Sequence, residues 1–535
     1  MAPAARFRPP VVLAILLAAG TAQAADVPAD PSNYQELLGT LQPGDTLVLA
    51  PGEYPRITID GLNGTADAWI TIAGQTDGSA IVTSDSCCNT VQIYGSSYVA
   101  IRDLVVDVQG LEVDAINAKD TPSHHILVER NTLQGFPAGS QQIVGINTKT
   151  TVHGWTIRGN TIIEPGTGLY LGGSEGDTPF VDGVIEQNLV VNPVGYCMQI
   201  KHQLDYTAPP ELDAGPHVTI VRNNVFIKDD RESPDGDRPN LLVGGFPDAG
   251  QGAEDTYQIY GNLLFYNPRE ALLQATGRVS IHDNVMVGAS PDFAAITVTD
   301  HQGKTVKRAY VYNNTIFGGG IAFSSAASED DAVFGNLVFG DDPIRGTIAD
   351  LRDNLTATQA DADMYVNDPA VMLGAMDFYP LVGAVAGAAL DVAKVTNDPD
   401  YDRDYNGTAK GDFTFRGAYA GEGMNPGCPL DAELKDGCGA GESGGDDDSG
   451  GVDESGSEGG SGNASASGSS TGSASGNDTS GADGSTSATS GGASESGGGD
   501  GCGCDQSQPR GAAFFVLALL WRRRVSAADR RCRAA

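Results

Sequence analysis

A short pattern of apolar and polar positions recurs along the middle of the chain. Each copy reads as an apolar residue, two variable residues, an asparagine, one variable residue and a second apolar residue, as in 221–226, Val-Arg-Asn-Asn-Val-Phe. The asparagines stand at positions 131, 160, 188, 224, 262, 284, 314 and 336, so the step between copies ranges from 22 to 38 residues. An earlier copy has Asp103 in place of the asparagine. A repeat with such irregular insertions indicates a solenoid in which each copy is one coil.

The residues around each asparagine predict short strands rather than helices. They alternate and are rich in β-branched residues, which favours extended structure. Asparagine suits a bend because it tolerates the left-handed backbone region and bonds to its own backbone. In stacked coils, the asparagine amides could pair from one coil to the next and satisfy polar groups inside the core.

These repeats resemble those of right-handed parallel β-helix proteins, the pectate-lyase-like superfamily, over residues 34–420. The segment 64–72, Gly-Thr-Ala-Asp-Ala-Trp-Ile-Thr-Ile, is also similar to a stretch in the chondroitinase B and alginate lyase family. The resemblance implies an all-β fold, a single-stranded right-handed parallel β-helix, with its coils over 81–345. A short helix at 34–38 is expected in the segment that caps the first coil.

Shifts in composition divide the chain into four parts. Residues 1–25 have basic residues before an apolar run and small residues near Ala24, which predicts a secretory signal peptide. The β-helix domain is expected over 26–425. Most of 426–500 is Gly, Ser, Ala, Thr and Asp, a composition that cannot bury a core and predicts a disordered linker. Residues 501–535 form a tail.

The tail combines a cysteine motif, an apolar run and an arginine cluster. Cys502 and Cys504 precede the apolar segment 512–521, and three arginines follow at 522–524. This arrangement resembles the myxobacterial C-terminal sorting tail, which implies a short hydrophobic helix, cleavage at the cysteine motif and display at the cell surface. The partners implied are the export machinery and a tail-processing membrane protease. A plain transmembrane anchor is the alternative, and it leads to the same surface or outer-membrane location.

The charge of the chain limits the partners that it can bind. Lys and Arg number 32 against 69 Asp and Glu, a formal net charge of −37. This excludes nucleic acid, because binding needs basic groups against the phosphates. Extracellular polysaccharide is the expected ligand, and a polyanionic one would need Ca²⁺ or a local basic patch. We expect a monomer, with a disulfide between Cys428 and Cys438 after export.

The candidate active site begins at the segment 195–203, Gly-Tyr-Cys-Met-Gln-Ile-Lys-His-Gln. If its apolar residues face the core, Gln199, Lys201 and Gln203 face outwards, because side chains alternate along a strand. In the chondroitinase B and alginate lyase family, a lysine at this point of a coil removes the proton α to a uronate carboxylate. The resemblance implies that role for Lys201, with His202 as the alternative base.

The same family has an arginine on the following coil, as an assisting acid. Here that place is 241–245, Leu-Leu-Val-Gly-Gly, which holds no arginine. Arg222 or Arg238 is expected to substitute for it in space, and His301 to lie on the same cleft two coils on.

Other residues are expected to complete this cleft. The insertions at 206–215, 228–240 and 247–255 lie on neighbouring coils and are expected to wall it. Ca²⁺ takes several oxygen ligands, and its predicted ligands are Glu254, Asp255 and Glu270. The predicted substrate-binding residues are Gln199, Gln203, Tyr257 and Gln274.

The sequence leaves three functional hypotheses, of which the third is the weakest. The first is a uronate polysaccharide lyase that acts by β-elimination. The second is a non-catalytic glycan-binding or structural surface module, which fits the missing arginine, the linker and the anchor. Glycoside hydrolysis needs two acids about 5 to 10 Å apart on one strand face, whereas the pairs Asp229–Asp230 and Asp341–Asp342 fall in predicted loops.

Overall fold

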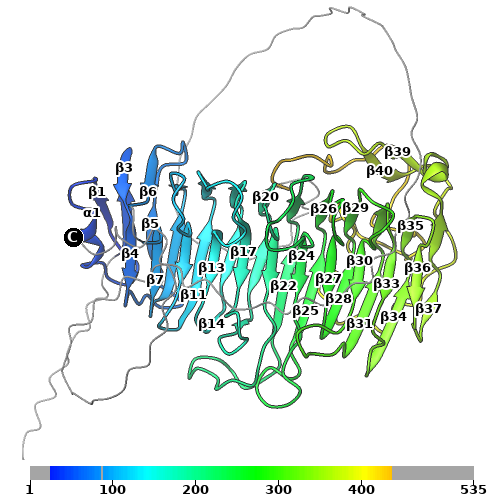
Figure 1. Cartoon of the computed structure of the whole chain (residues 1–535), viewed down its shortest axis with the longest axis horizontal. Helices are drawn as coiled ribbons and strands as arrows, with labels where there is room; N and C mark the ends of the chain where they lie inside the picture. Colours follow the sequence, from blue (N-terminus) through cyan, green and yellow to red (C-terminus); the bar gives the residue numbers. More distant parts are fainter. Residues whose placement is uncertain (1–23, 86–87, 436–535) are drawn as a thin grey trace, which may run out of the picture.

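The computed structural model describes residues 24–85 and 88–435. Within them, three parallel sheets wind into one solenoid (Figure 1). Each coil contributes a strand to sheet A, then to sheet B, then to sheet C, before the next coil begins. The predicted all-β parallel β-helix is confirmed.

The strands of each sheet lie in the following spatial order. Sheet A contains β1 (Asp26–Ala29), β2 (Thr46–Leu49), β5 (Ile70–Ala73), β8 (Ser97–Arg102), β11 (Ser123–Glu129), β15 (Thr156–Arg158), β19 (Val184–Glu186), β22 (Val218–Arg222), β25 (Thr256–Tyr260), β28 (Arg278–His282), β31 (Arg308–Tyr312), β34 (Asp330–Phe334) and β37 (Leu351–Arg352), and β14 (Val152–His153) pairs with β11 and with β18 (Phe180–Val181). Sheet B contains β3 (Gly52–Pro55), β6 (Ala80–Thr83), β9 (Val105–Asp107), β12 (Thr132–Gln134), β16 (Thr161–Ile163), β20 (Leu189–Val191), β23 (Val225–Ile227), β26 (Leu263–Phe265), β29 (Val285–Val287), β32 (Thr315–Phe317), β35 (Leu337–Phe339) and β38 (Leu355–Ala357). Sheet C contains β4 (Ile57–Asp60), β7 (Val91–Tyr94), β10 (Ile116–Ala118), β13 (Val144–Thr148), β17 (Thr167–Leu171), β21 (Met198–Ile200), β24 (Leu241–Val243), β27 (Leu273–Ala275), β30 (Ile296–Val298), β33 (Ile321–Phe323) and β36 (Ile344–Gly346).

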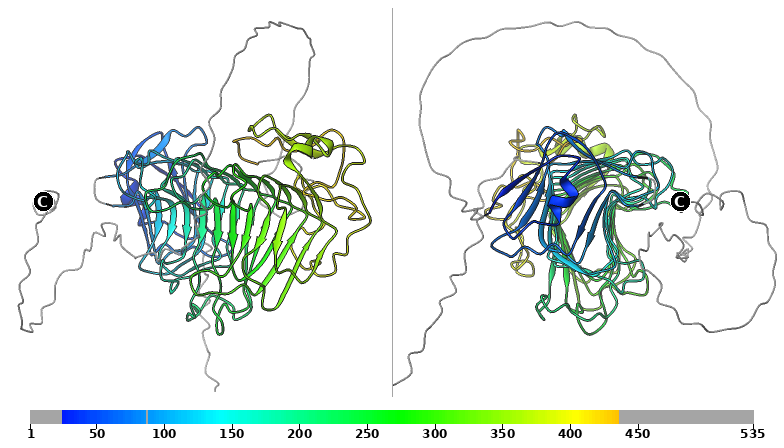
Figure 2. Two further views of the ribbon diagram at one scale, coloured as in Figure 1. Left: turned by 45° about the vertical axis from the view of Figure 1, so that its right-hand side comes forward. Right: turned by 90° about the vertical axis from the view of Figure 1, so that its left-hand side faces the viewer.

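The core lies between the three sheets and is filled by the inward residues of every coil. Register keeps like residues together, as where Ile157 pairs with Ile185 and Ile185 with Val221. The helix α1 (Tyr34–Leu38) buries Tyr34 and Leu38 at the N-terminal end of this core (Figure 2, right). Its position confirms the expected short helix.

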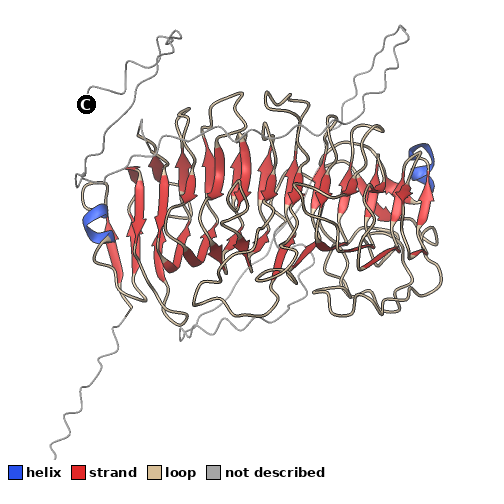
Figure 3. Ribbon diagram, turned by 60° about the horizontal axis from the view of Figure 1, so that its bottom comes forward, coloured by secondary structure: helices blue, strands red, loops and turns tan. Residues whose placement is uncertain are grey.

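The coils extend further than the sequence indicated. Strands from β1 onwards already pair in the sheets, so coils begin well before residue 81, where they were expected to begin, and the last coil reaches β38, beyond the expected end at 345. Beyond it lie the short 3-10 helix η1 (Gln359–Met364), at the opposite end of the solenoid from α1 (Figure 3), and an antiparallel pair of β39 (Val366–Asp368) and β40 (Asp377–Pro380).

The repeated asparagines form a ladder at the corner between sheets A and B. The Nδ2 atom of each donates to Oδ1 of the next, as from Asn188 to Asn224 at 2.9 Å and from Asn224 to Asn262 at 3.0 Å. The backbone N–H of Asn224 donates to the same Oδ1 of Asn262 at 2.9 Å. The ladder runs on to Asn354, one coil past the last predicted copy. Coil-to-coil pairing of the amides is therefore confirmed.

The left-handed residue at this corner is the one before the asparagine. Asn223, Asp283 and Asn313 have φ values of 56°, 53° and 50°, whereas the ladder residue Asn224 is not among the residues with positive φ. The interpretation that the asparagine itself takes the left-handed bend was wrong. The ladder fixes the position of Asn224, because its side-chain oxygen and nitrogen and its backbone N–H all form hydrogen bonds in the ladder.

The segment after β40 packs over the same corner (Figure 1, yellow to orange). Lys410 Nζ lies 2.7 Å from Asp283 Oδ2, and Lys435 Nζ lies 3.0 Å from Asn223 Oδ1. Cys428 and Leu430 belong to a buried apolar cluster of this segment. The domain therefore continues past the predicted boundary at 425, and 426–435 is not linker.

Candidate functional site

The outer face of sheet C carries a column of mostly polar side chains. In each strand one residue points outwards, because the residues on either side of it are buried towards the core. From β7 to β33 these outward residues pair in register, and they are Gln92, Asn117, Asn147, Tyr170, Gln199, Leu242, Gln274, Thr297 and Ala322. The predicted outward position of Gln199 is thus found, and Gln274 lies in the same column.

Several amides of this column keep an unused hydrogen-bonding atom. Gln199 and Asn117 are 1% exposed and Asn147 is fully buried, yet Gln199 Nε2 and the Oδ1 atoms of both asparagines have no hydrogen-bond partner among the described residues. Asp114 accepts hydrogen bonds from Asn117 Nδ2 at 3.3 Å and from Asn147 Nδ2 at 2.9 Å, and burial raises its pKa. Buried polar atoms are nearly always paired, so these three amides are exceptions, and they lie in one part of the column, with only Tyr170 between Asn147 and Gln199.

Lys201 follows β21 directly, on the outward side of the coil. Its side chain is 2% exposed, and its Nζ lies 5.8 Å from the centroid of the Tyr170 ring, one coil back in the column. Its backbone N–H donates to Leu171 O at 2.8 Å, which fixes the residue in the turn between sheets C and A. A buried cation is costly unless it is compensated, and lysine is rarely buried without a specific role.

His202 and Lys304 lie beside Lys201. The Nδ1 atom of His202 is 2.7 Å from Gln302 Oε1. Burial lowers the pKa of His202, and hydrogen bonds with Gln302 and with the backbone of Glu175 oppose that shift. The positive charges of Lys201 and Lys304 lower the pKa further. Burial therefore favours the neutral imidazole, the form that can accept a proton, so His202 stays a candidate base beside Lys201.

A tight turn holds Gln302 against His202. The backbone N–H of His301 donates to Lys304 O at 3.0 Å, and that of Lys304 donates to His301 O at 2.9 Å. Gln302 at the tip of the turn has a φ of 49°. The predicted His301 thus belongs to the turn that supplies two neighbours of His202.

Gly244 and Gly245, on the coil that follows Lys201, leave the space that His202 and Lys304 occupy. A Cβ on Gly244 would lie 2.3 Å from the His202 backbone nitrogen, and one on Gly245 would lie 2.3 Å from the Lys304 Cβ. Lys304, 9% exposed, therefore places a cation where the family resemblance implies an arginine. Sequence reasoning missed this residue because it comes from a turn two coils further on, and the glycine pair was its only signal.

The three predicted loops border sheet C on two opposite edges. In the 206–215 loop, Tyr206 and Leu212 pack against Val181, and Gly250 and Gly252 of the 247–255 loop approach Asp205 and Tyr206 at the same edge (Figure 1, below β22 and β25). The 228–240 loop lies at the other edge. Its contacts include those of Asp235 with Gln142 at 3.0 Å and of Ser233 with Gln141 at 2.5 Å.

Neither candidate arginine joins Lys201. Arg222, at the end of β22 in sheet A, forms an ion pair with Glu186 at 2.8 Å and contacts Asp400 of the C-terminal segment. The guanidinium of Arg238 lies 5.8 Å from the ring centroid of Tyr196, which precedes β21, whereas Lys201 follows it. Since a strand rises about 3.3 Å per residue, the two cations are separated by the length of the strand.

Two of the predicted substrate-binding residues face the interior. Tyr257 is fully buried in the core and stacks on Phe246, with ring centroids 4.5 Å apart. Gln203 is 1% exposed, and its Nε2 donates to Phe180 O at 3.2 Å. Both predictions are corrected. Gln203 turns inwards because alternation ends where the chain turns after Lys201, and Tyr257 shares the inward face of β25 with Ile259.

The predicted Ca²⁺ ligands do not form one site. Glu254 pairs with Arg278 at 3.2 Å, and Asp255 Oδ1 accepts a hydrogen bond from the backbone of His217 at 2.8 Å. Glu270 accepts one from the backbone of Ala271, at the opposite edge of sheet C, and burial raises its pKa. No group of three or more metal-ligating side chains occurs in the described residues, so these carboxylates do not fit a Ca²⁺ ion.

The remaining predictions concern the two ends of the chain. Cys428 is disulfide-bonded, and its expected partner Cys438 lies outside the described residues, as do Cys502, Cys504 and most of the expected signal peptide. None of the helices in the described part of the chain has the length and apolar character of a membrane span.

Solved structures of the same general architecture exist, although no family model and no curated protein matches this chain. An alginate lyase from a Paenibacillus species is 17% identical over 62% of this chain and 99% of its own, with a TM-score of 0.39. The A-module of a mannuronan C-5 epimerase from Azotobacter vinelandii is 15% identical over 62% of this chain and 100% of its own, with a TM-score of 0.38. An α-1,3-glucanase from Streptomyces thermodiastaticus is 15% identical over 61% and 64%, with a TM-score of 0.40. Such likeness concerns the fold alone.

Proposed function

We propose that the protein binds a uronate-bearing polysaccharide along the outer face of sheet C and cleaves it by β-elimination. The observation that carries this proposal is the buried Lys201, which lies with Lys304 and His202 beside Gln199 in the middle of the column. The whole chain has a net charge of −37, so two lysines at this place are a local exception. A local basic patch offsets the electrostatic repulsion between the acidic chain and an acidic polymer.

The column suits an extended polymer. Neighbouring strands of a sheet lie about 4.8 Å apart, so the outward residues follow one another with one position for each coil. Tyr170, Gln274 and Thr297 are partly exposed and can donate to and accept from hydroxyl and carboxylate groups, whereas Asn117, Asn147 and Gln199 are buried in the same column. The ligand would lie across the strands and parallel to the solenoid axis.

In the proposed reaction, Lys201 first releases a proton to water, and its free amine then takes the proton from the sugar carbon α to the carboxylate. The electron pair of that C–H bond forms a carbon–carbon double bond, and the bond from the next carbon to the glycosidic oxygen breaks. The leaving oxygen takes a proton from the Tyr170 hydroxyl, which regains one from water. Lys304 stabilises the negative charge that develops on the carboxylate. The step uses no metal ion.

A non-catalytic glycan-binding or structural module is the second candidate. The observation that favours it is the pair Gly244–Gly245, which stands where the lyase family has an arginine. In that case the same column and the same cations would bind the polymer, and Lys201 would serve as a counter-charge only.

The location of the protein is also proposed from its two ends. The features of 1–25 support export, and those of 501–535 support retention at the cell surface through a tail that a membrane protease processes. An extracellular site is where a secreted polysaccharide would be met. The solenoid is proposed to act as a monomer.

The proposal is tested by incubating the protein with alginate, pectate and chondroitin, with and without Ca²⁺, and recording the ultraviolet absorbance of unsaturated uronate. The Lys201→Ala variant is the matched control. A rise in absorbance with the wild type that the variant lacks supports the lyase. Saturable binding of these polymers without any rise in absorbance identifies the binding module. If the protein shows no binding and no rise in absorbance, both proposed functions are contradicted.

A further inference from the structure

A second row of polar residues crosses the beginning of the sheet A strands, away from the column on sheet C. Asn63, Ser97, His124 and His153 occupy matching positions on successive coils, and Val181 follows them. The Ser97 hydroxyl donates to Asn63 Oδ1 at 2.9 Å. The rings of His124 and His153 are stacked, with centroids 4.9 Å apart and planes at 3°. The row is a continuous polar strip that ends at an apolar residue.

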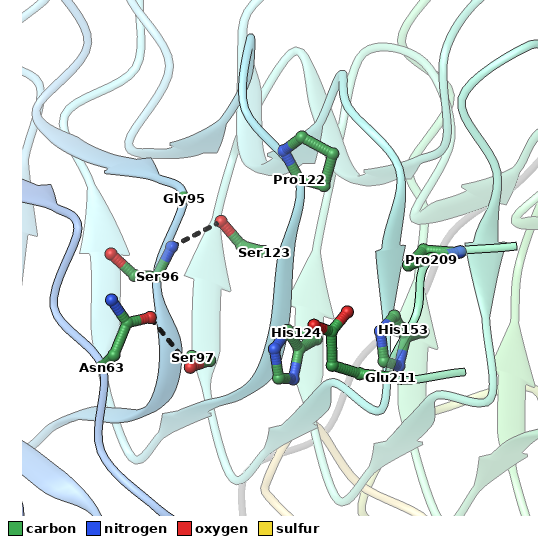
Figure 4. Close-up of a pocket in the computed structure, with 10 residues that line it drawn as sticks. All are labelled: Asn63, Gly95, Ser96, Ser97, Pro122, Ser123, His124, His153, Pro209 and Glu211. Atoms are coloured by element: carbon green, nitrogen blue, oxygen red, sulfur yellow. Dashed lines mark hydrogen bonds between the residues drawn. The ribbon is translucent and has the colours of Figure 1, made fainter. Parts of the chain in front are cut away.

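The 206–215 loop covers this row. Its apolar residues Tyr206 and Leu212 pack against Val181, and that contact brings Pro209 and Glu211 over the histidines (Figure 4). The cavity between loop and row has a volume of about 160 Å³. Sites for drug-sized ligands measure roughly 300 to 1,000 Å³, so this cavity suits one ring-sized group rather than a segment of chain.

The lining consists of uncharged hydrogen-bonding groups and one carboxylate. Ser96 and Ser123 line the cavity beside the row, and Glu211 faces it from the loop (Figure 4). None of the described residues that line it is a lysine or an arginine. His153 is 3% exposed, and its Nε2 has no hydrogen-bond partner among the described residues. A buried and unpaired imidazole nitrogen in a polar cavity indicates a ligand that can pair with it.

The histidine rings are held rigidly before any ligand binds. Tyr98 and His125 both have left-handed φ values, 53° and 50°, and their rings stack at 4.6 Å. A Cβ on Gly154 would lie 3.1 Å from the His125 Nε2, so only glycine leaves room for that ring. His125 Nδ1 lies 2.9 Å from His124 Nδ1 and fixes its orientation. Backbone strain of this kind is commonly found at binding sites.

We propose that this cavity binds one neutral, hydroxyl-rich ring, such as a single hexose residue at the end or branch of a polysaccharide. Sugar hydroxyls both donate and accept, which matches serine hydroxyls, an asparagine amide, neutral imidazoles and a carboxylate. An anionic sugar is disfavoured, because Glu211 would repel it and none of the described lining residues is a lysine or an arginine. The site thus takes a different class of sugar from the column beside Lys201.

The two histidines are neutral at neutral pH, as the proposal requires. Burial lowers the pKa of His124, and burial with the charges of His124 and His125 lowers the pKa of His153 to about 4. Glu211 opposes both shifts, and His217 adds to that of His153. Neutral imidazole offers one donor and one acceptor, whereas two stacked imidazolium rings would repel each other.

The test uses the full-length protein with ¹⁵N-labelled histidine, titrated with glucose, galactose, mannose, N-acetylglucosamine, glucuronate and glycerol. The chain has seven histidines, and they report on both sites at once. His124, His125 and His153 lie at the cavity, and His202 and His301 lie at the Lys201 cluster. We expect at least one neutral sugar to shift the cavity resonances saturably, with glucuronate weaker and glycerol without effect.

Matched variants then assign the binding. Glu211→Gln, on an exposed loop, is expected to weaken the neutral sugar roughly tenfold or more, because a hydrogen bond to a charged group is lost. Lys201→Met is expected to leave that affinity unchanged, which separates this site from the proposed lyase site. The proposal is overturned if no neutral sugar moves the cavity resonances, if glycerol moves them equally, or if Glu211→Gln binds as tightly as the wild type.

Discussion

The ammonium group of Lys201 lies 5.8 Å from the centre of the Tyr170 ring, although the two residues come from successive coils. The parallel pairing of β17 with β21 creates this relationship, because it places Tyr170 beside Gln199, two residues before the lysine. The phenol hydroxyl also donates to Ser174 Oγ at 3.0 Å. The residues proposed as base and as proton donor thereby lie close together on successive coils.

Replacing Tyr170 by phenylalanine separates the two contributions of this ring. Tyr170→Phe keeps the aromatic face against Lys201 and removes only the hydroxyl. We expect kcat on the cleaved polysaccharide to fall about 10²-fold or more, which is the usual contribution of a general acid, while the Kd for the polymer changes little. Steady-state rates and binding isotherms check this. An unchanged kcat would show that another group protonates the leaving oxygen.

The asparagine ladder is expected to dominate local stability. Asn224→Ala removes the acceptor of two hydrogen bonds from Asn188, its Nδ2 at 2.9 Å and its backbone N–H at 3.0 Å. A buried donor that loses its partner costs about 1 to 3 kcal/mol. We therefore expect a loss of roughly 2 to 5 kcal/mol in the free energy of unfolding, measured by urea denaturation. Asn397→Ala, at an exposed position, is the control and should cost less than about 0.5 kcal/mol.

Lys410 holds the C-terminal segment to the solenoid. Its Nζ lies 2.7 Å from Asp283 Oδ2, and the side chains are only 5% and 2% exposed. Lys410→Met leaves a buried carboxylate without its cation, which costs roughly 3 to 5 kcal/mol. We expect limited proteolysis to cut first between 390 and 435 in this variant. The double variant Lys410→Met with Asp283→Leu should recover part of the loss, and failure to recover any would refute the pairing as the cause.

The protein should become less stable as the pH is lowered, because the histidines at the cavity are buried in their neutral form. Burial and neighbouring histidines lower the pKa of His153 from 6.5 to about 4 in the folded protein. Between these two values the unfolded chain binds the proton and the folded protein does not, so stability is lost as the pH falls from about 6.5 to about 4. The expected loss from this group is roughly 2 to 3 kcal/mol. In urea titrations, His153→Phe should lose correspondingly less stability than the wild type, and equal pH slopes would contradict the assignment.

The sequence predicts the scaffold well because the scaffold repeats. Each copy of the pattern fixes a strand, a corner and a place in the asparagine ladder, so the copies support one another. Side chains alternate along the strand, so Met198 and Ile200 face the core and Gln199 and Lys201 face outwards. The left-handed corner residue was misassigned, because the pattern marks the corner but not which of two adjacent residues bends there.

Contacts between distant coils could not be predicted in this way. Lys304 reaches His202 from two coils beyond Gly245, and the 206–215 loop folds back over His124 and His153. Spacing along the chain gives the order of the coils, but the direction in which a loop folds depends on packing such as that of Leu212 on Val181. The predicted role of Gln203 was wrong because alternation ends at the turn after Lys201, and that of Tyr257 was wrong because it shares the inward face of β25 with Ile259.

The central claim is that Lys201 acts as the base, and the kinetics of Lys201→Arg test it most directly. Arginine keeps the positive charge but is not deprotonated in proteins, so it can bind the polymer and cannot take the proton. On whichever polysaccharide the wild type cleaves, we predict that kcat falls by about 10² to 10⁴ while the Kd stays within about threefold, and that the surface control Lys394→Met keeps wild-type values. A Lys201→Arg variant that retains its kcat would contradict the account.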